Sequence, residues 1–161
     1  NNNNNNNNNN PTTTNIHDLD AASQTAMVLG EVLCAQGRLD EALRVLLRVE
    51  ALRMQRRPCG AYAAGAQLAA RAVAEVQVDQ GAFAAARPRL EAALEFYSAP
   101  MIGEHPLSLV NTLKALVRLH RDLDDLPTAL ALHERAMAAV HAIASPRAIA
   151  RTHLQLAKLR L

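Results

Sequence analysis

A short phrase recurs three times along the chain at almost constant spacing. It reads GRLDEA at residues 37–42, GAFAAA at 81–86 and DDLPTA at 124–129, so that its starting points lie 44 and 43 residues apart. A period in this range is typical of stacked helical repeats, in which one unit cannot bury its apolar face alone. In each phrase a flexible or acidic residue ends one helix, an apolar residue fills the turn, and a small alanine lets the next helix pack closely. The phrase therefore predicts a stack of helix pairs.

The composition favours helices, and it separates a helical domain from an asparagine-rich leader. Half of the 161 residues are hydrophobic but only 2% are aromatic, and tryptophan is absent. Alanine and leucine, which have the highest helix propensities, therefore supply the core. We predict a helical repeat domain over residues 21–161. Residues 1–20 are predicted to be a low-complexity leader, disordered or of unassigned identity, because ten identical asparagines offer no apolar face.

Helix ends are marked by glycine, proline and acidic residues. Gly37 and Gly81 follow the last turns of two helices, and Pro106 suits the first turn of another. Asp124 and Asp125 are candidate caps. Pro88 predicts a kink or a later start in its helix. The pattern predicts three hairpins and half of a fourth, with helices over 21–36, 39–57, 62–80, 83–97, 106–121, 126–143 and 146–161.

A set of small and apolar positions recurs with this period. The set comprises Leu29, Gly30, Gly37, Leu39, Ala42, Ala74, Gly81, Phe83, Ala86, Ala93, Leu116, Leu126, Ala129, Ala136, Leu156 and Ala157. In these residues the chain resembles the tetratricopeptide repeat family. Its longer period, together with His105-Pro106 and the ERAM segment at 134–137, is similar to the type found in kinesin light chains. Val117 and Asp124 depart from the family pattern, and the paired asparagines of the light-chain groove are missing.

This resemblance implies an all-α fold: a right-handed superhelical stack of antiparallel helix pairs with about three and a half repeats, a TPR-like α-solenoid. It also implies that the first helix of each pair lines a concave groove. Residues on one stripe of these helices are spaced by three or four positions. The predicted partner-binding residues are Arg71, Glu75, Asn111, Lys114, Arg118, Arg121, Arg151, Gln155 and Lys158.

The groove is expected to grade from mixed charge at its N-terminal end to basic at its C-terminal end. Our hypothesis is that the basic members of the stripe hold an acidic segment of a partner protein, because arginine and lysine form charge-assisted bonds with carboxylates. The competing interpretation is an ordinary solvated helix face. A second expectation concerns the last helix, which leaves Leu154, Leu156 and Leu159 uncovered. We expect this end to dock on another subunit or to continue into further repeats.

Other function classes find little support in the sequence. No HExxH, GxSxG or phosphate-binding loop is present, and Cys34 and Cys59 form no CxxC, so neither an enzyme, a cofactor nor a metal site is expected. The net charge of +2 and the few aromatic residues argue against nucleic-acid binding, although arginines gather at 53–57 and 87–89. No long apolar run or signal-like start is found. A cytoplasmic location, cytoskeletal or ciliary in particular, is therefore expected.

Two functional hypotheses follow. The first is a scaffold or adaptor that binds a partner segment in the groove, as a subunit of a larger cytoskeletal or axonemal assembly. The second is the helical accessory domain of a larger enzyme, such as a SET/MYND-type methyltransferase, in which similar repeats follow the catalytic part. A cysteine-rich zinc module upstream would favour the second, and further repeats the first.

Overall fold

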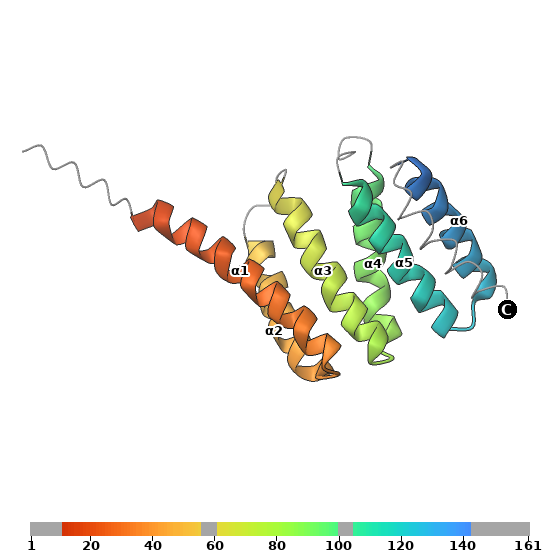
Figure 1. Ribbon diagram of the computed structural model, residues 1–161, viewed down its shortest axis with the longest axis horizontal. Coiled ribbons are helices and arrows are strands. Elements are labelled where there is room, and N and C mark those ends of the chain that lie inside the picture. The colour runs from red at the N-terminus through yellow and green to blue at the C-terminus, as the bar shows by residue number, and fades with distance from the viewer. Residues whose placement is uncertain (1–10, 56–60, 100–104, 143–161) are drawn as a thin grey trace, which may run out of the picture.

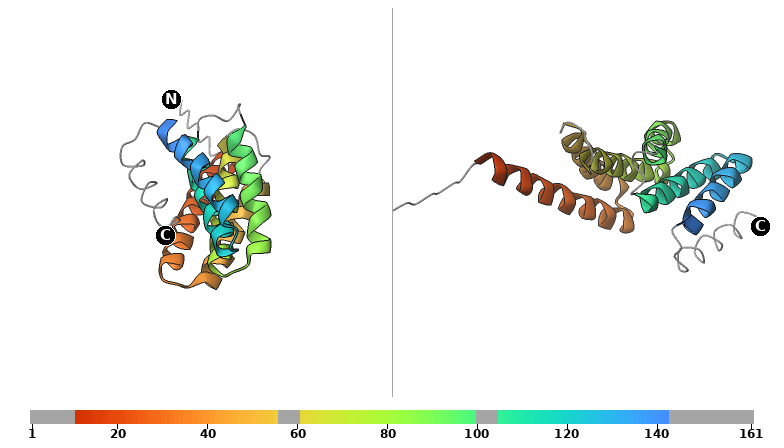
Figure 2. Two further views of the ribbon diagram at one scale, coloured as in Figure 1. Left: turned by 90° about the vertical axis from the view of Figure 1, so that its right-hand side faces the viewer. Right: turned by 90° about the horizontal axis from the view of Figure 1, so that it is seen from above.

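The computed structural model describes residues 11–55, 61–99 and 105–142. Within these ranges six helices follow one another without a strand. They are α1 (Pro11–Ala35), α2 (Leu39–Gln55), α3 (Ala61–Asp79), α4 (Phe83–Ser98), α5 (Pro106–Asp122) and α6 (Leu126–Ala142). The helices stand side by side in chain order, alternately pointing down and up (Figure 1). Seen from above, the row is bent into an arch with α1 and α6 at its two ends (Figure 2).

The predicted all-helical array of paired helices is confirmed, because each helix packs against the next one along the chain. The main difference lies at the N-terminal end. Helix α1 begins at Pro11 and not near residue 21. Proline is favoured in the first turn of a helix, and no helix breaker lies between Pro11 and Gly30. The second half of the predicted leader is therefore helical. Residues 1–10 and the predicted last helix at 146–161 lie outside the described residues.

The turns within the three hairpins have the same backbone geometry. Gly37, Gly81 and Asp124 are left-handed, with φ of 74°, 76° and 62°. In each turn the next residue donates its N–H to a carbonyl five residues earlier, at 2.9, 2.8 and 2.9 Å. These bonds close a Schellman motif, which satisfies carbonyl groups left unpaired at the end of a helix. Each copy of the recurring sequence phrase therefore begins with the same type of turn.

Pro88 lies inside α4, which begins at Phe83. The first turn of this helix is held by the N–H groups of Ala85 and Ala86, which both donate to the carbonyl of Ala82 at 3.1 Å. The alternative of a later start is therefore wrong for α4. The side chain of Pro88 is exposed.

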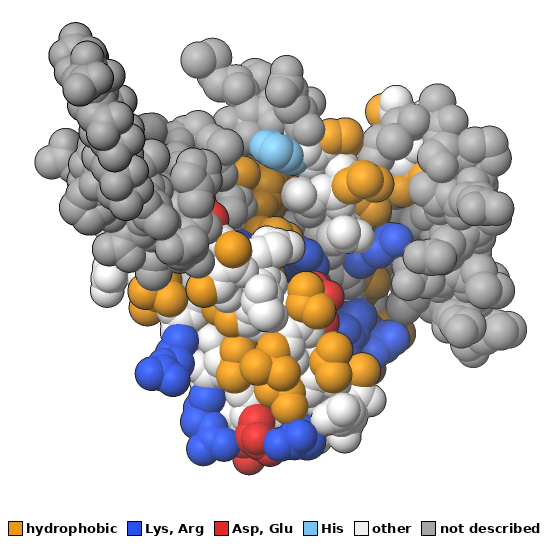
Figure 3. All heavy atoms as spheres, turned by 60° about the vertical axis from the view of Figure 1, so that its left-hand side comes forward, with side chains coloured by type: hydrophobic (Ala, Val, Ile, Leu, Met, Phe, Trp, Pro, Cys, Tyr) orange, Lys and Arg blue, Asp and Glu red, His pale blue; other side chains and the backbone are white. Residues whose placement is uncertain are grey.

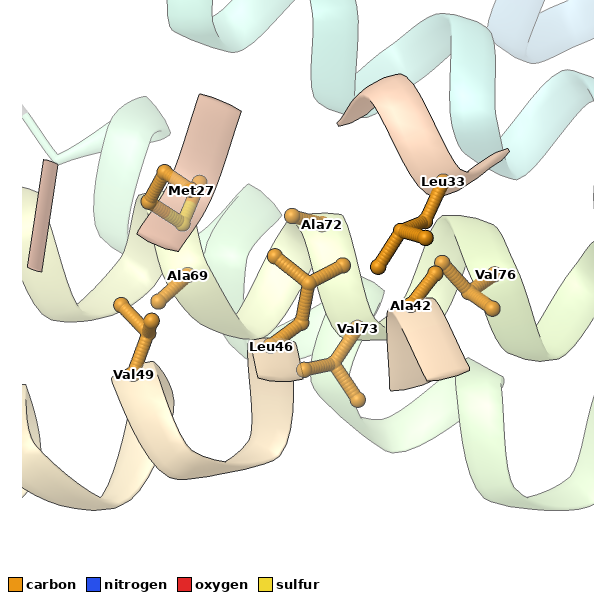
Figure 4. Packing of buried hydrophobic residues seen from close by; sticks show 9 residues of the cluster. All are labelled: Met27, Leu33, Ala42, Leu46, Val49, Ala69, Ala72, Val73 and Val76. Carbon is orange, nitrogen blue, oxygen red and sulfur yellow. The ribbon is translucent and has the colours of Figure 1, made fainter. Parts of the chain in front are cut away.

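The core is built where the second helix of one pair meets the first helix of the next. In the first such layer, Leu46 and Val49 of α2 lie against Ala69, Ala72 and Val73 of α3 (Figure 4). A second layer joins α4 to α5 in the same way. Its buried members are Ala74, Val78, Ala86, Leu90, Ala115, Leu116 and Leu119. Charged side chains of α1, α3 and α5 lie outside these layers and line a shared pocket.

Candidate functional site

Side chains from three helices that are distant in sequence surround one hollow. Helices α1, α3 and α5 line a pocket of about 190 Å³, to which α2 adds Leu46. We call it the central hollow and define it by the residues Met27, Glu31, Arg71, Glu75, Asp79 and Arg118. Helices α3 and α5 also contact each other directly. The first helices of the three pairs therefore share a surface.

Two of the predicted residues form an ion pair on α3. The guanidinium of Arg71 donates to the carboxylate of Glu75 one turn further along the helix. The side chain of Arg71 is only 14% exposed, and its Nε is buried without a hydrogen-bond partner in the described part of the chain. Burial raises the pKa of Glu75, while the positive charge of Arg71 opposes that rise. The Nε–H group of Arg71 is therefore a hydrogen-bond donor that this ion pair does not use.

A second ion pair crosses the hollow between helices. Arg118 of α5 donates to Asp79 at the end of α3, and both side chains are partly exposed. Glu31 of α1 is exposed on the same hollow. The hollow thus holds three carboxylates and two guanidinium groups, with the carboxylates toward α1 and α3. Within the described residues its charge is mixed.

The remaining predicted residues lie elsewhere or outside the described ranges. Asn111 is exposed and Lys114 half-buried on α5, but neither lines the pocket. Arg121 pairs with its neighbour Asp122 at 2.8 Å. Arg151, Gln155 and Lys158 belong to the predicted last helix and lie outside the described residues. The structure therefore brings together Arg71, Glu75 and Arg118, and keeps Arg121 apart from them.

Sequence reasoning did not single out Asp79 or Cys34, which both line the pocket. Asp79 continues the stripe of Arg71 and Glu75 by another four residues, and Cys34 lies three residues after Glu31. Helical spacing was a sufficient signal for both. Burial raises the pKa of the Cys34 thiol, and the nearby carboxylates of Asp79, Glu75 and Glu31 raise it further. A raised pKa lowers the thiolate fraction, so Cys34 is a weak nucleophile at neutral pH.

The arginines outside the hollow join helices to one another. Arg53 of α2 donates to the carbonyl of Gly65 at 3.0 Å and to Gln24 at 3.3 Å. Arg89 of α4 pairs with Glu50 of α2 at 3.1 Å. Both arginines therefore have hydrogen-bond or ion-pair partners inside the protein.

The described residues contain neither a cluster of metal ligands nor a helix able to cross a membrane. No group of three or more histidine, cysteine or acidic side chains in these ranges is placed to hold a metal ion. None of the described helices has both the length and the apolar character that a membrane crossing requires.

In comparisons with known proteins, no family model, no curated protein and no solved structure matches the chain. We therefore infer the function of the protein from the side chains of the central hollow.

Proposed function

We propose that this chain is a scaffold that holds an extended segment of a partner protein in the central hollow. One observation supports the proposal most: α1, α3 and α5 bring charged side chains of both signs to one shared surface. The right-handed superhelix of the tetratricopeptide type belongs to the same proposal. It is supported by the regular period, by the three matching left-handed turns and by the small residues at the helix contacts.

The two sides of the hollow suit different groups of a partner. On the α5 side, Arg118 is half-exposed, and its planar guanidinium carries five N–H donors, of which Asp79 uses only part. An acidic residue of the partner can therefore bind Arg118 without displacing Asp79. On the side of α1 and α3, Glu31 and Glu75 favour an amide or basic group. A segment with an acidic residue facing α5 and a basic residue facing α1 fits this arrangement in one orientation.

The proposal is tested by selecting ligands from a phage-displayed library of random peptides against the purified chain. We expect enrichment of peptides that contain an acidic residue, and loss of their binding when Arg118 is replaced by glutamate. The matched control is Arg87→Glu, which makes the same change on an exposed residue of α4. Equal binding to the Arg118→Glu variant and to the control would refute the role of Arg118.

A charge swap separates recognition from folding. In the double variant Asp79→Arg with Arg118→Asp, the ion pair between α3 and α5 is kept but its direction is reversed. If Arg118 contacts the partner, the swapped protein folds normally and fails to bind the selected acidic peptides. If Arg118 serves only the packing of α5 on α3, the swap retains full binding.

A further inference from the structure

Helix α1 carries an apolar ridge that faces solvent. Val28, Leu29 and Val32 are 50%, 48% and 46% exposed. Beside the ridge, α1 and α2 form a groove of about 420 Å³, whose lining combines the apolar Leu29, Leu33 and Val45 with the charged Arg38, Glu41, Arg44 and Arg48. We call the ridge and groove together the N-terminal face. Figure 3 shows apolar side chains gathered over the first hairpin, with basic side chains at the margin.

The internal repeat allows the ridge of α1 to be compared with the same positions on α3 and α5. When the three hairpins are aligned on their left-handed turn residues, the ridge of α1 matches two sets of buried residues. The matching positions are Ala72, Val73 and Val76 of α3, and Ala115, Leu116 and Leu119 of α5. All six are at least nine-tenths buried. The same positions that are covered in the second and third pairs are therefore uncovered in the first.

The structure also shows what covers these positions. On α3 they pack against Ala42, Leu46 and Val49 of α2. On α5 they pack against Ala86 and Leu90 of α4, which are followed by the buried Ala93. Both covering helices thus present a small residue, a leucine four positions later and a small or β-branched residue three positions after that. This stripe defines the apolar surface that fits α1.

Polar contacts between successive pairs indicate the charge of a helix that would pack on the N-terminal face. Arg89 of α4 pairs with Glu50 of α2, and Gln80 donates to Asp40 of α2 at 2.8 Å. Arg135 of α6 donates to Ser98 of α4 at 3.1 Å. In these three contacts the later pair supplies the donor and the second helix of the earlier pair supplies the acceptor, whereas Arg53 of α2 donates in the other direction, to the carbonyl of Gly65 of α3.

Arg48 occupies the position in the first pair that Arg135 occupies in the third, and Arg44 lies one turn before it. Neither arginine forms an ion pair within the described residues. Carboxylates on a docked helix would therefore be able to form ion pairs with them. A second copy of this chain is a poor source of such a helix, because the corresponding stripes of α2, α4 and α6 are already buried, the last at Ala129, His133 and Ala136.

We propose that the N-terminal face docks an amphipathic helix of a different polypeptide, with an Ala-x3-Leu-x2-Ala or Val stripe flanked by carboxylates. This surface is separate from the central hollow. The docked helix takes the place that α2 takes against α3, and its flanking carboxylates face Arg44 and Arg48.

The probe is a fluorescent synthetic peptide with the sequence of residues 39–55, in which the three arginines at 44, 48 and 53 are replaced by glutamate. Fluorescence anisotropy should show saturable binding to the full chain. A peptide with lysine at the three positions should bind more weakly, and one with Leu46→Asp should not bind. In the protein, Leu29→Asp with Val32→Asp should weaken binding about tenfold or more, because charges would enter the apolar contact. Arg44→Glu with Arg48→Glu should reverse the preference between the acidic and lysine peptides.

The matched control is Leu52→Asp, an equally exposed leucine of α2 that does not line the groove. Circular dichroism checks that each protein variant keeps its helices. Absence of binding at millimolar peptide, or equal binding to the Leu29→Asp/Val32→Asp protein and the control, overturns the proposal. Self-association of the chain in sedimentation that Leu29→Asp abolishes would assign this face to a second copy and also overturn it.

Discussion

Gly30 of α1 lies directly against Leu46 of α2. A Cβ atom added to Gly30 would lie 2.6 Å from Cδ2 and 2.7 Å from Cγ of Leu46, well inside van der Waals contact. Leu46 cannot move aside freely, because it is almost fully buried among α1, α2 and α3 (Figure 4). The close approach of the first two helices therefore depends on the absence of a side chain at position 30.

Replacing Gly30 by alanine should destabilise the protein. Alanine gains about 0.5–1 kcal/mol in helix propensity, but overpacking a filled core costs about 1–3 kcal/mol. We expect a net loss of about 1–2 kcal/mol in urea unfolding. In a Leu46→Ala background the clash is absent, so the same Gly30→Ala change should become stabilising. A destabilisation of equal size in both backgrounds would contradict the contact.

Replacing Asp124 by glycine should stabilise the protein. Asp124 adopts the left-handed conformation that glycine occupies in the other two turns, and that conformation is unfavourable for residues with a Cβ. The greater freedom of glycine in the unfolded chain offsets part of this relief of strain, so we expect a net gain of about 0.5–1 kcal/mol in thermal or urea unfolding. The reciprocal control is Gly81→Ala, which should lower stability. A lower melting temperature for Asp124→Gly would show that its side chain has another role.

Asp125 should contribute a pH-dependent part of the stability. Its carboxylate accepts the N–H of Thr128 at 3.3 Å and contacts Nδ1 of His120 at 3.0 Å. Hydrogen bonding to Thr128 lowers the pKa of Asp125, and His120 lowers it further. Because the folded pKa is below the unfolded value, the contribution is complete above the ordinary aspartate range and is lost as the pH falls through the folded pKa.

The variant Asp125→Asn keeps a capping side chain but removes this titration. The stability of the wild type should therefore fall more steeply than that of the variant as the solution is acidified. Glu41→Gln is a second test of the same linkage, because Arg38 lowers the pKa of Glu41, and it should also make the loss of stability on acidification less steep. Parallel acid-unfolding profiles for the wild type and Asp125→Asn would contradict the role of the cap.

Arg53 should be important for stability because it joins three helices. It lies on α2 and donates to Gly65 of α3 and to Ser23 and Gln24 of α1. Replacing it by methionine leaves the apolar stem but removes these donors, and we expect a loss of about 1–3 kcal/mol. The same change at the exposed Arg44 should alter the free energy of unfolding by less than about 0.5 kcal/mol. Equal effects at both positions would contradict the bridging role of Arg53.

Much of the fold could be predicted from the sequence because its signals are local. Gly37 and Gly81 fix left-handed turns, and Pro106 fixes the start of α5, whatever surrounds them. The start of α1 was misplaced because residues 11–20 lack the apolar spacing on which the prediction relied, although proline at position 11 permits a helix.

The hollow was less predictable because its contacts join distant helices. Helical spacing placed Arg71 and Glu75 on one stripe, but the partner of Arg118 is Asp79, 39 residues away. Which acidic group faces Arg118 depends on how α5 crosses α3, and the sequence does not encode that angle locally. The exposed ridge of α1 was not recognised because Val28, Leu29 and Val32 read as core residues in any helical pattern.

The most direct test of the scaffold proposal is to map a bound peptide by NMR. Backbone amide chemical shifts would be measured before and after adding an acidic peptide selected from the phage library. We predict that the largest changes fall on Glu31, Arg71, Glu75 and Arg118, across α1, α3 and α5. Changes confined to the opposite surface, at Arg87 of α4 and its neighbours, with the hollow unaffected, would contradict the proposed function.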